Sequence, residues 1–308
     1  QGNLATALRR NGLSGDALVP QRRAVLLDPK SAGVMLALAQ IHSDLGGLLN
    51  SERAHARAAV LDPLNPEIWY NLGVLRIQLD QMARAAQAYR PHARLLHGRP
   101  GNQATADPMP SLPVEPVRPV ARVCCLHRLT HDRDQLTHLR DQDLLPRDME
   151  DEPERYQALI DGLSEEERAA ITFPLDGRRY LTIARSWNRY VHLEQTGWTL
   201  ERPALNPDLD WPGLEAAFLD GDPRCLAIDR LVTPAALGAL QRVCRNSTFW
   251  HQIKGAGYLG AYLREGFSDP LILAIAHQLR DRLPRVLGDQ PVRMIWAYSY
   301  DQGMVGIN

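Results

Sequence analysis

Three side chains of the kind that ligate metals stand at helical spacing near the middle of the chain. Cys124, His127 and His131 occupy positions i, i+3 and i+7, so on a helix all three would project from one face. The segment from Val120 to Leu126 is short and largely apolar, however, and predicts a strand, which would scatter these side chains. No fourth ligand follows in register and no Cys-x-x-Cys pair accompanies them. Structural zinc therefore stays an alternative to the favoured interpretation, a histidine cluster beside a buried cysteine.

Two further motifs have the spacing of enzyme sites but not the surroundings. Residues 255–260 read Gly-Ala-Gly-Tyr-Leu-Gly, and Asp281 follows about 20 residues later, as in dinucleotide-binding units. The preceding residues 248–254 are aromatic and polar instead of an apolar strand, so we do not expect a nucleotide there. Ser247 and His251 are a possible nucleophile and base, but no Gly-x-Ser-x-Gly turn surrounds Ser247. We assign no catalytic residue and no metal ligand within residues 1–308.

The composition excludes several classes of protein. The chain has 308 residues, enough for two ordinary domains, and its 44% hydrophobic and 23% charged content is typical of a folded protein. With 35 basic and 36 acidic residues the net charge is -1, which favours no nucleic-acid partner. The apolar runs are shorter than the roughly 20 residues of a membrane-spanning helix, so no membrane insertion is expected. Four scattered cysteines predict no disulfide framework, and a cytoplasmic location is the default expectation.

Residues 1–97 contain an internal repeat. The sequence Leu27-Asp28-Pro29 recurs 34 residues later as Leu61-Asp62-Pro63. Small residues recur where the two helices of a hairpin must approach closely, at Ala5, Ala39 and Gly73 in the first helices and at Ala24 and Ala58 in the second. The third repeat is the clearest, with a pattern formed by Trp69, Leu72, Gly73, Ala85 and Tyr89.

This segment resembles tetratricopeptide repeats, which implies an α-helical solenoid of stacked hairpins. The alignment of Pro29 with Pro63 places Gln1 inside the first helix, so we expect sequence to precede it. The resemblance implies a protein or peptide partner. We predict that Asn71, Arg76 and Gln78, on the first helix of the third repeat, bind an extended peptide.

After residue 97 the repeat pattern ends. Residues 98–120 include six prolines and predict an extended, semi-rigid linker. Residues 121–225 predict a mixed extension of unclear role, in which Ser164 and Glu167 form a capping box and Tyr180 to Ala184 is a strand. In residues 226–308 we expect a strand at Leu226 to Ile228. Helices should begin after Thr233 and Asp269, and a β-type run extends from Met294 to Tyr300.

The order of motifs in residues 226–308 is similar to the N-terminal part of a prolyl-hydroxylase-like oxygenase domain that depends on Fe(II) and 2-oxoglutarate. The motifs are Leu-Val-Thr-Pro before a helix, Gly-Tyr-Leu-Gly-Ala-Tyr at 257–262, Gly266-Phe267 and Trp-Ala-Tyr-Ser-Tyr-Asp at 296–301. The resemblance implies a double-stranded β-helix whose His-x-Asp/Glu pair and distant His hold the iron. The sequence reaches Asn308 where the His-x-Asp strand is expected. We therefore expect either that residues 1–308 are a fragment or that the fold is open and another chain covers its exposed edge. Fe(II) and 2-oxoglutarate are expected only if the chain continues.

By the same resemblance, Tyr298 and Tyr300 lie on a strand whose tyrosines reach 2-oxoglutarate. The alternative is that Trp296, Tyr298 and Tyr300 simply pack one face of a sheet.

Two functions remain open. In the first, a repeat-tethered dioxygenase hydroxylates a protein or peptide that the repeats recruit, and residues 1–308 are inactive alone. In the second, the repeats are the whole function, and the chain is a non-catalytic interaction or assembly factor. The predicted fold class is multidomain, a helical solenoid followed by a mixed α+β domain resembling an incomplete double-stranded β-helix.

Overall fold

The computed structural model describes residues 1–103, 109–254 and 258–300. The chain divides into two compact units. Unit 1 comprises Gln1–Leu96 with Pro291–Arg293, and unit 2 comprises His97–Gln290 and the chain from Met294 onward. No helix within the described residues is long and apolar enough to cross a membrane.

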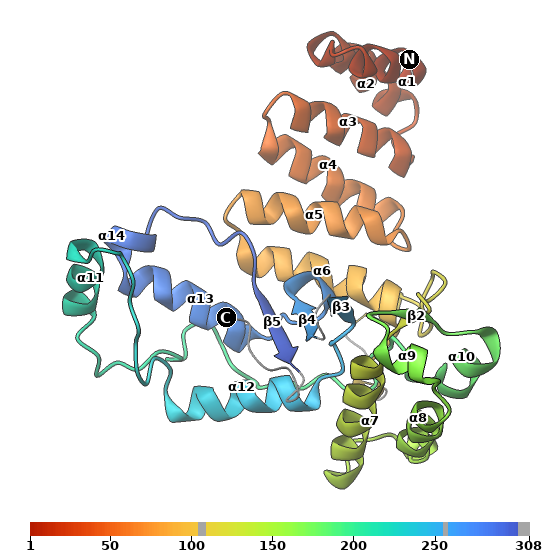
Figure 1. Cartoon of the computed structure of the whole chain (residues 1–308). Coiled ribbons are helices and arrows are strands. Elements are labelled where there is room, and N and C mark those ends of the chain that lie inside the picture. The colour runs from red at the N-terminus through yellow and green to blue at the C-terminus, as the bar shows by residue number, and fades with distance from the viewer. Residues whose placement is uncertain (104–108, 255–257, 301–308) are drawn as a thin grey trace. The chain divides into compact units, whose positions relative to one another are not determined.

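Unit 1 is built from antiparallel helices that stack in chain order (Figure 1). Consecutive helices pair into three hairpins, α1 with α2, α3 with α4 and α5 with α6. The bounds are α1 (Gly2–Arg10), α2 (Ser14–Leu27), α3 (Ala32–Asp44), α4 (Leu48–Leu61), α5 (Pro66–Gln78) and α6 (Met82–His97). The repeat architecture predicted from the 34-residue period is therefore confirmed.

Local sequence explains where the first helices of the second and third hairpins begin. The Ser31 hydroxyl accepts a hydrogen bond from the Val34 N–H at 3.3 Å and caps α3. Asn65 caps α5 in the same way, and Pro66 occupies the first turn, where no N–H is needed. These two caps are 34 residues apart because the second and third hairpins repeat the same signal.

The recurring small residues let the helices of unit 1 approach closely. Ala5, Ala39 and Ala58 have no exposed surface. Gly73 is also buried, and a Cβ atom placed there would lie 2.3 Å from Cε1 of Tyr89 on α6. Leu72 and Ile68 of α5 fill the adjacent core with Met35 of α3. The spacing of small and large residues therefore fixes which helices stack.

Unit 2 begins with a helical part packed around Trp187, whose side chain has no exposed surface. The Trp187 Nε1–H donates to the Ala121 carbonyl at 2.8 Å. The surrounding elements are β1 (Val123–Cys124), α7 (Leu126–Asp141), α8 (Glu152–Asp161), α9 (Glu165–Ala169), β2 (Phe173–Pro174) and α10 (Gly177–Ile183). Strands β1 and β2 pair antiparallel, and the capping box predicted at Ser164 and Glu167 is confirmed.

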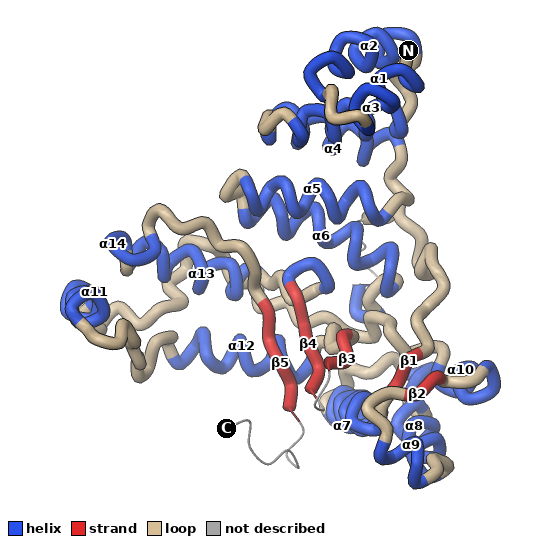
Figure 2. The backbone as a smooth tube through the Cα atoms, turned by 45° about the horizontal axis from the view of Figure 1, so that its top comes forward, coloured by secondary structure: helices blue, strands red, loops and turns tan. Residues whose placement is uncertain are grey.

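The remainder of unit 2 combines helices with a small sheet. The helices are α11 (Trp211–Asp220), α12 (Pro234–Asn246), α13 (Pro270–Arg282) and α14 (Pro284–Leu287). Thr233 caps α12 and Asp269 caps α13, as predicted. Strands β3 (Gln252–Lys254), β4 (Tyr258–Tyr262) and β5 (Trp296–Tyr300) form an antiparallel sheet in that order, drawn red in Figure 2. This sheet is too small to test the predicted double-stranded β-helix.

One predicted strand is much shorter than expected, and two others are wrong. The run from Val120 to Leu126 holds only the two-residue β1, because the Cys125 side chain caps a helix that begins at Leu126. Residues 180–184 lie mostly in α10, which Asp176 caps by accepting from the Arg179 N–H. Residues 226–228 form no strand: Ile228 packs against a cluster with Trp211 instead of pairing with a neighbour.

The predicted proline-rich linker is irregular where it is described. A 3₁₀ turn occupies Gly101–Gln103, and the Arg99 N–H donates to the Val114 carbonyl at 2.8 Å. Glu115 forms an ion pair with Arg189. The segment belongs to unit 2, and the Glu115 ion pair joins it to the rest of that unit. Residues 104–108 of the predicted linker lie outside the described residues.

Candidate functional site

The predicted peptide-binding residues separate into two groups. Asn71 and Gln78 are both exposed on α5, and their spacing of seven residues places them on one face of the helix. Val74 lies between them on α5. The equivalent positions are also exposed or half-buried on α3, 34 residues earlier, and on α1, a further 34 residues earlier. We call these three positions and their equivalents on α1 and α3 the first-helix stripe: Asn3, Thr6, Arg10, Ala37, Gln40, Asp44, Asn71, Val74 and Gln78.

Arg76 lies away from the first-helix stripe. Its Nε atom donates to Oε1 of Glu52 on α4 at 2.9 Å, and its Nη1 donates to the Arg84 carbonyl at 3.0 Å. Arg84 also pairs with Glu52, at 3.2 Å. The Glu52 side chain is only 7% exposed, so its carboxylate is held between two guanidinium groups at the junction of the second and third hairpins. The role that the structure gives Arg76 is to join hairpins.

The predicted cofactor-binding tyrosines lie on one face of the β3-β4-β5 sheet. In the antiparallel register Tyr300 is opposite Tyr258, and Tyr298 is opposite Gly260. The ring centroid of Tyr258 is 5.0 Å from that of Tyr298 and 5.2 Å from that of Tyr300. Tyr298 and Tyr300 are 37% and 51% exposed, and Trp296 on the same face is 47% exposed. The rings therefore pack on one another while leaving a broad aromatic surface.

Two cations lie close to the ring of Tyr262 on β4. The Lys254 Nζ is 4.9 Å from the Tyr262 ring centroid, and the Arg264 guanidinium carbon is 4.6 Å from it. Burial opposes ionisation of Tyr262, but hydrogen bonds with Lys254 and Tyr298 and the charges of the two cations lower its pKa below the ordinary value. The surroundings of the Tyr262 ring are therefore suited to a group that carries negative charge.

The predicted histidine cluster shows no metal-binding geometry. Cys124 lies in β1 and His127 and His131 lie on α7, with the two imidazole centroids 6.4 Å apart. Burial raises the pKa of the Cys124 thiol far above its ordinary value, which disfavours the thiolate that a metal requires. The described residues contain no group of three or more His, Cys, Asp or Glu that could hold a metal. They therefore do not fit an iron site.

The residues of the other two enzyme-like motifs, around Ser247 and around Gly260, have structural roles. The Ser247 hydroxyl accepts from the Glu194 N–H at 3.0 Å, at the end of α12. Gly260 lies within β4, so it does not open a helix as a dinucleotide loop would. Gly255 and Gly257 of that motif lie outside the described residues.

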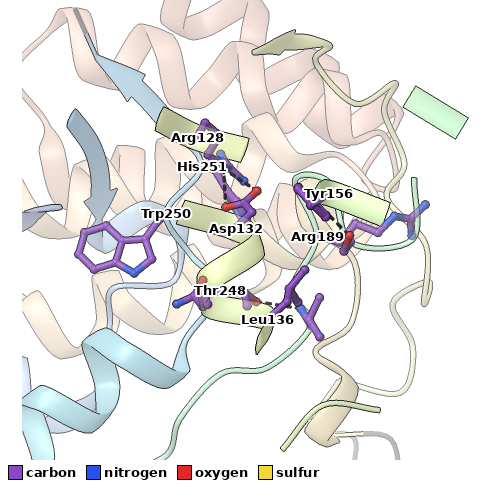
Figure 3. A pocket seen from close by; sticks show the side chains of 11 residues that line it. Arg128, Asp132, Leu136, Tyr156, Arg189, Thr248, Trp250 and His251 are labelled. Carbon is purple, nitrogen blue, oxygen red and sulfur yellow. Dashed lines mark hydrogen bonds and ion pairs between the residues drawn. The ribbon is translucent and has the colours of Figure 1, made fainter. Parts of the chain in front are cut away.

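A buried polar pocket in unit 2 was not predicted from the sequence (Figure 3). The Nε atom of Arg128 donates to both carboxylate oxygens of Asp132 at 2.7 Å, and both side chains belong to α7. Arg128 is 2% exposed and its guanidinium lies 4.9 Å from the Trp187 ring centroid. Tyr156, Thr248, Trp250 and His251 complete much of the lining. The segments that meet here are far apart in sequence, which is why periodicity alone could not find the pocket.

The dimensions and charges of this pocket indicate a structural role. Its empty space is about 260 Å³ including the part open to solvent, and the centre of a water molecule can occupy only about 10 Å³ of it. That is room for about one water molecule. Burial, together with the charges of His97 and Arg128, lowers the pKa of His251 well below its ordinary value, so its imidazole is neutral at pH 7. The pocket is too small to be a substrate site.

Comparison with known proteins does not name a family. No family model matches the chain, and no curated protein matches it. Among solved structures, the crystal structure of MamA aligns at 16% sequence identity with a TM-score of 0.29. The alignment covers 51% of this chain and 72% of MamA. A similarity of that size carries no functional argument, so the function must be argued from the residues themselves.

Proposed function

We propose that the chain is a protein-interaction factor whose unit 1 binds a protein or peptide partner on the first-helix stripe. The observation that carries this proposal is the repeated exposure of the same positions on α1, α3 and α5, on helices whose opposite faces are buried. Asn71 and Gln78 make no side-chain hydrogen bond with other described residues, so they are available to a partner. Stacked hairpins commonly present such an extended surface.

A bulky double substitution tests this proposal. The probe is a 12-residue peptide selected against the full chain from a random-sequence display library. We expect Asn71→Arg combined with Gln78→Arg to weaken its binding at least about 10-fold, because two long cations would cover the part of the stripe on α5. Fluorescence anisotropy of the labelled peptide measures the change.

The matched control carries substitutions on α4. Arg53 and Arg57 are exposed there, outside the first-helix stripe, and replacing both with glutamine should leave the affinity within about twofold. Peptides whose binding is unchanged by the α5 double substitution, or weakened only by the α4 control, would place the binding surface elsewhere.

A second candidate function is the 2-oxoglutarate-dependent oxygenase that the sequence resemblance implies. The observation that favours it is the Tyr298 and Tyr300 face together with Lys254 and Arg264 beside Tyr262, an arrangement chemically suited to a carboxylate. The described residues offer no iron site, so we derive no reaction step. In this proposal the repeats recruit the protein or peptide, Lys254 and the tyrosines hold the co-substrate, and metal ligands would have to lie outside the described residues.

Direct binding of 2-oxoglutarate separates the two candidates. If the second is correct, the purified chain binds 2-oxoglutarate in a calorimetric titration, and Lys254→Met weakens that binding by about 10-fold or more because a charge-assisted hydrogen bond is lost. Ser299→Ala, on the opposite face of β5, is the control. If the titration shows no heat of binding, this face does not bind 2-oxoglutarate and the oxygenase proposal is contradicted. The interaction function is unaffected by that result.

A further inference from the structure

A buried histidine ring is stacked on a second histidine ring in unit 2. The ring centroids of His97 and His251 lie 4.0 Å apart, and the two planes are tilted by 31°. The ring of Tyr190 is close to both, with its centroid 5.0 Å from that of His97 and 5.4 Å from that of His251. His251 is 9% exposed, and its Nδ1 atom has no hydrogen-bond partner among the described residues. A second ring proton at Nδ1 would therefore be buried without an acceptor.

The pocket beside His251 offers no free negative charge to an imidazolium. Asp132 is the one acidic residue in the described lining of that pocket (Figure 3). Both of its oxygens accept from the Nε atom of Arg128, and Nδ1 of His131 lies 3.3 Å from one of them. The charge of Arg128 also disfavours a second cation at His251. Protonation of His251 is therefore opposed both by burial and by a neighbouring cation.

Other charged and titratable groups lie on the segments around the stack. They are Tyr156 of α8, Arg189 with its ion-pair partner Glu115, His192, Glu194 and Glu265. Burial raises the pKa of Tyr156 and of Tyr190 well above the ordinary value, so both are neutral. Burial lowers the pKa of His192 although Glu194 opposes it, so this group responds to acid in the same direction as the stacked histidine. Burial raises the pKa of Glu265, and a carboxyl of that kind stabilises the fold in acid. Acid therefore weakens this region through its buried histidines, and Glu265 opposes the effect.

The stack closes a seam between three segments of unit 2. The Tyr190 N–H donates to the His97 carbonyl at 3.1 Å. The Thr248 N–H donates to the His192 carbonyl at 2.9 Å. Strand β3 begins directly after the stacked residues, so the seam also positions the start of the sheet. A charge that disrupts the stack would release residues 248–254 together.

We propose that His97, Tyr190 and His251 form an acid-sensitive latch, which holds residues 248–254 in place at neutral pH and releases them when His251 is protonated. The pKa of His251 lies well below its ordinary value of 6.5 because of burial and of the charges of His97 and Arg128. The closed latch therefore binds fewer protons than the open one. It keeps its full stability above about pH 6.5 and weakens as the pH falls below that value. This inference concerns unit 2 and does not rest on peptide binding by unit 1.

Hydrogen exchange of the full chain at pH 7.5 and pH 5.5 tests the latch, after correction for the intrinsic exchange rate at each pH. With an open-state pKa of 6.5, the opening constant for residues 248–254 should rise about 10-fold between the two conditions. Amides of α13 should change by less than about twofold, because the histidine on that helix, His277, is exposed.

Two variants separate the latch from general instability in acid. His251→Phe keeps a flat ring in the stack but cannot be protonated, so it should retain the protection of residues 248–254 at pH 7.5 and lose most of the pH effect. The matched control is His277→Gln on the surface of α13. It should retain the full change of about 10-fold.

The latch is wrong if wild-type protection of residues 248–254 is equal at the two pH values. It is also wrong if His251→Phe responds to acid as strongly as the wild type. If His251→Phe already exposes these residues at pH 7.5, an NMR titration of the wild-type His251 ring decides instead. A midpoint at least about one unit below 6.5 supports the latch, and any higher midpoint contradicts it, because the ring would then titrate like one in water.

Discussion

Replacing Asp132 with alanine is expected to destabilise unit 2 by about 3–5 kcal/mol, because it leaves the Arg128 cation buried without a partner. Arg128 is 2% exposed, and its Nε atom bonds both oxygens of Asp132. Its buried Nη1 has no hydrogen-bond partner among the described residues, so no neighbour can replace the lost carboxylate. Hydrogen exchange of the α7 and α8 amides should report the change, since unfolding of a two-unit chain need not be two-state.

The matched control for this substitution is Asp134→Ala on the same helix. Asp134 pairs with Arg133, but its side chain is 63% exposed, and such surface pairs contribute less than about 1 kcal/mol. If the α7 amides are equally protected from hydrogen exchange in the Asp132 and Asp134 variants, the buried ion pair does not stabilise unit 2.

The same ion pair predicts a pH dependence. Burial alone would raise the pKa of Asp132, but the charges and hydrogen bonds of Arg128 and His131 together outweigh it and hold the pKa below the ordinary value of 3.8. A carboxyl whose pKa is lower in the folded state stabilises that state above its unfolded pKa, and the stabilisation is lost as the pH falls through the folded pKa. The extra stability of the wild type over Asp132→Asn should therefore shrink only in acid, at pH values below about 4.

Replacing Gly73 with alanine is expected to destabilise the third hairpin by about 2–3 kcal/mol through overpacking. The new Cβ would lie 2.3 Å from Cε1 and 2.6 Å from Cζ of Tyr89. Tyr89 is 6% exposed, and its ring centroid lies 6.2 Å from that of Tyr70, so it has little room to move. Faster hydrogen exchange in α5 and α6 is the expected readout.

Two variants separate this steric effect from helix propensity. Gly33→Ala in α3 meets nothing closer than the Ser31 hydroxyl at 3.8 Å, so it should stabilise the helix by up to about 1 kcal/mol. Adding Tyr89→Leu to Gly73→Ala removes the ring that clashes and should recover part of the loss. If Gly73→Ala behaves like Gly33→Ala, close approach of α5 and α6 does not explain the glycine.

The repeats could be predicted because their determinants are local and periodic. The 34-residue spacing carries both the caps at Ser31 and Asn65 and the small residues at each helix contact. The failures in unit 2 have a different origin. Short apolar runs at 120–126 and 180–184 do not distinguish strand from helix, and the caps that decide the matter, Cys125 and Asp176, act through side-chain geometry.

The candidate site was predicted only in part for similar reasons. Helical position alone places Asn71 and Gln78 on an exposed face. It cannot show that Arg76 faces Glu52, because that ion pair joins residues 24 positions apart. The buried pocket draws Arg128 and His251 from distant segments, so only the tertiary structure brings them together. Peptide binding by Asn71, Arg76 and Gln78 stays a prediction.

Site-specific photocross-linking tests the central claim, that a peptide partner lies on the first-helix stripe, most directly. Benzoylphenylalanine would replace Asn71 on the stripe or, as the control, Arg57 on the exposed face of α4. The account predicts that the selected peptide cross-links from position 71 and that unlabelled peptide competes, with little product from position 57. Cross-linking from position 57 alone, with none from position 71, would contradict it.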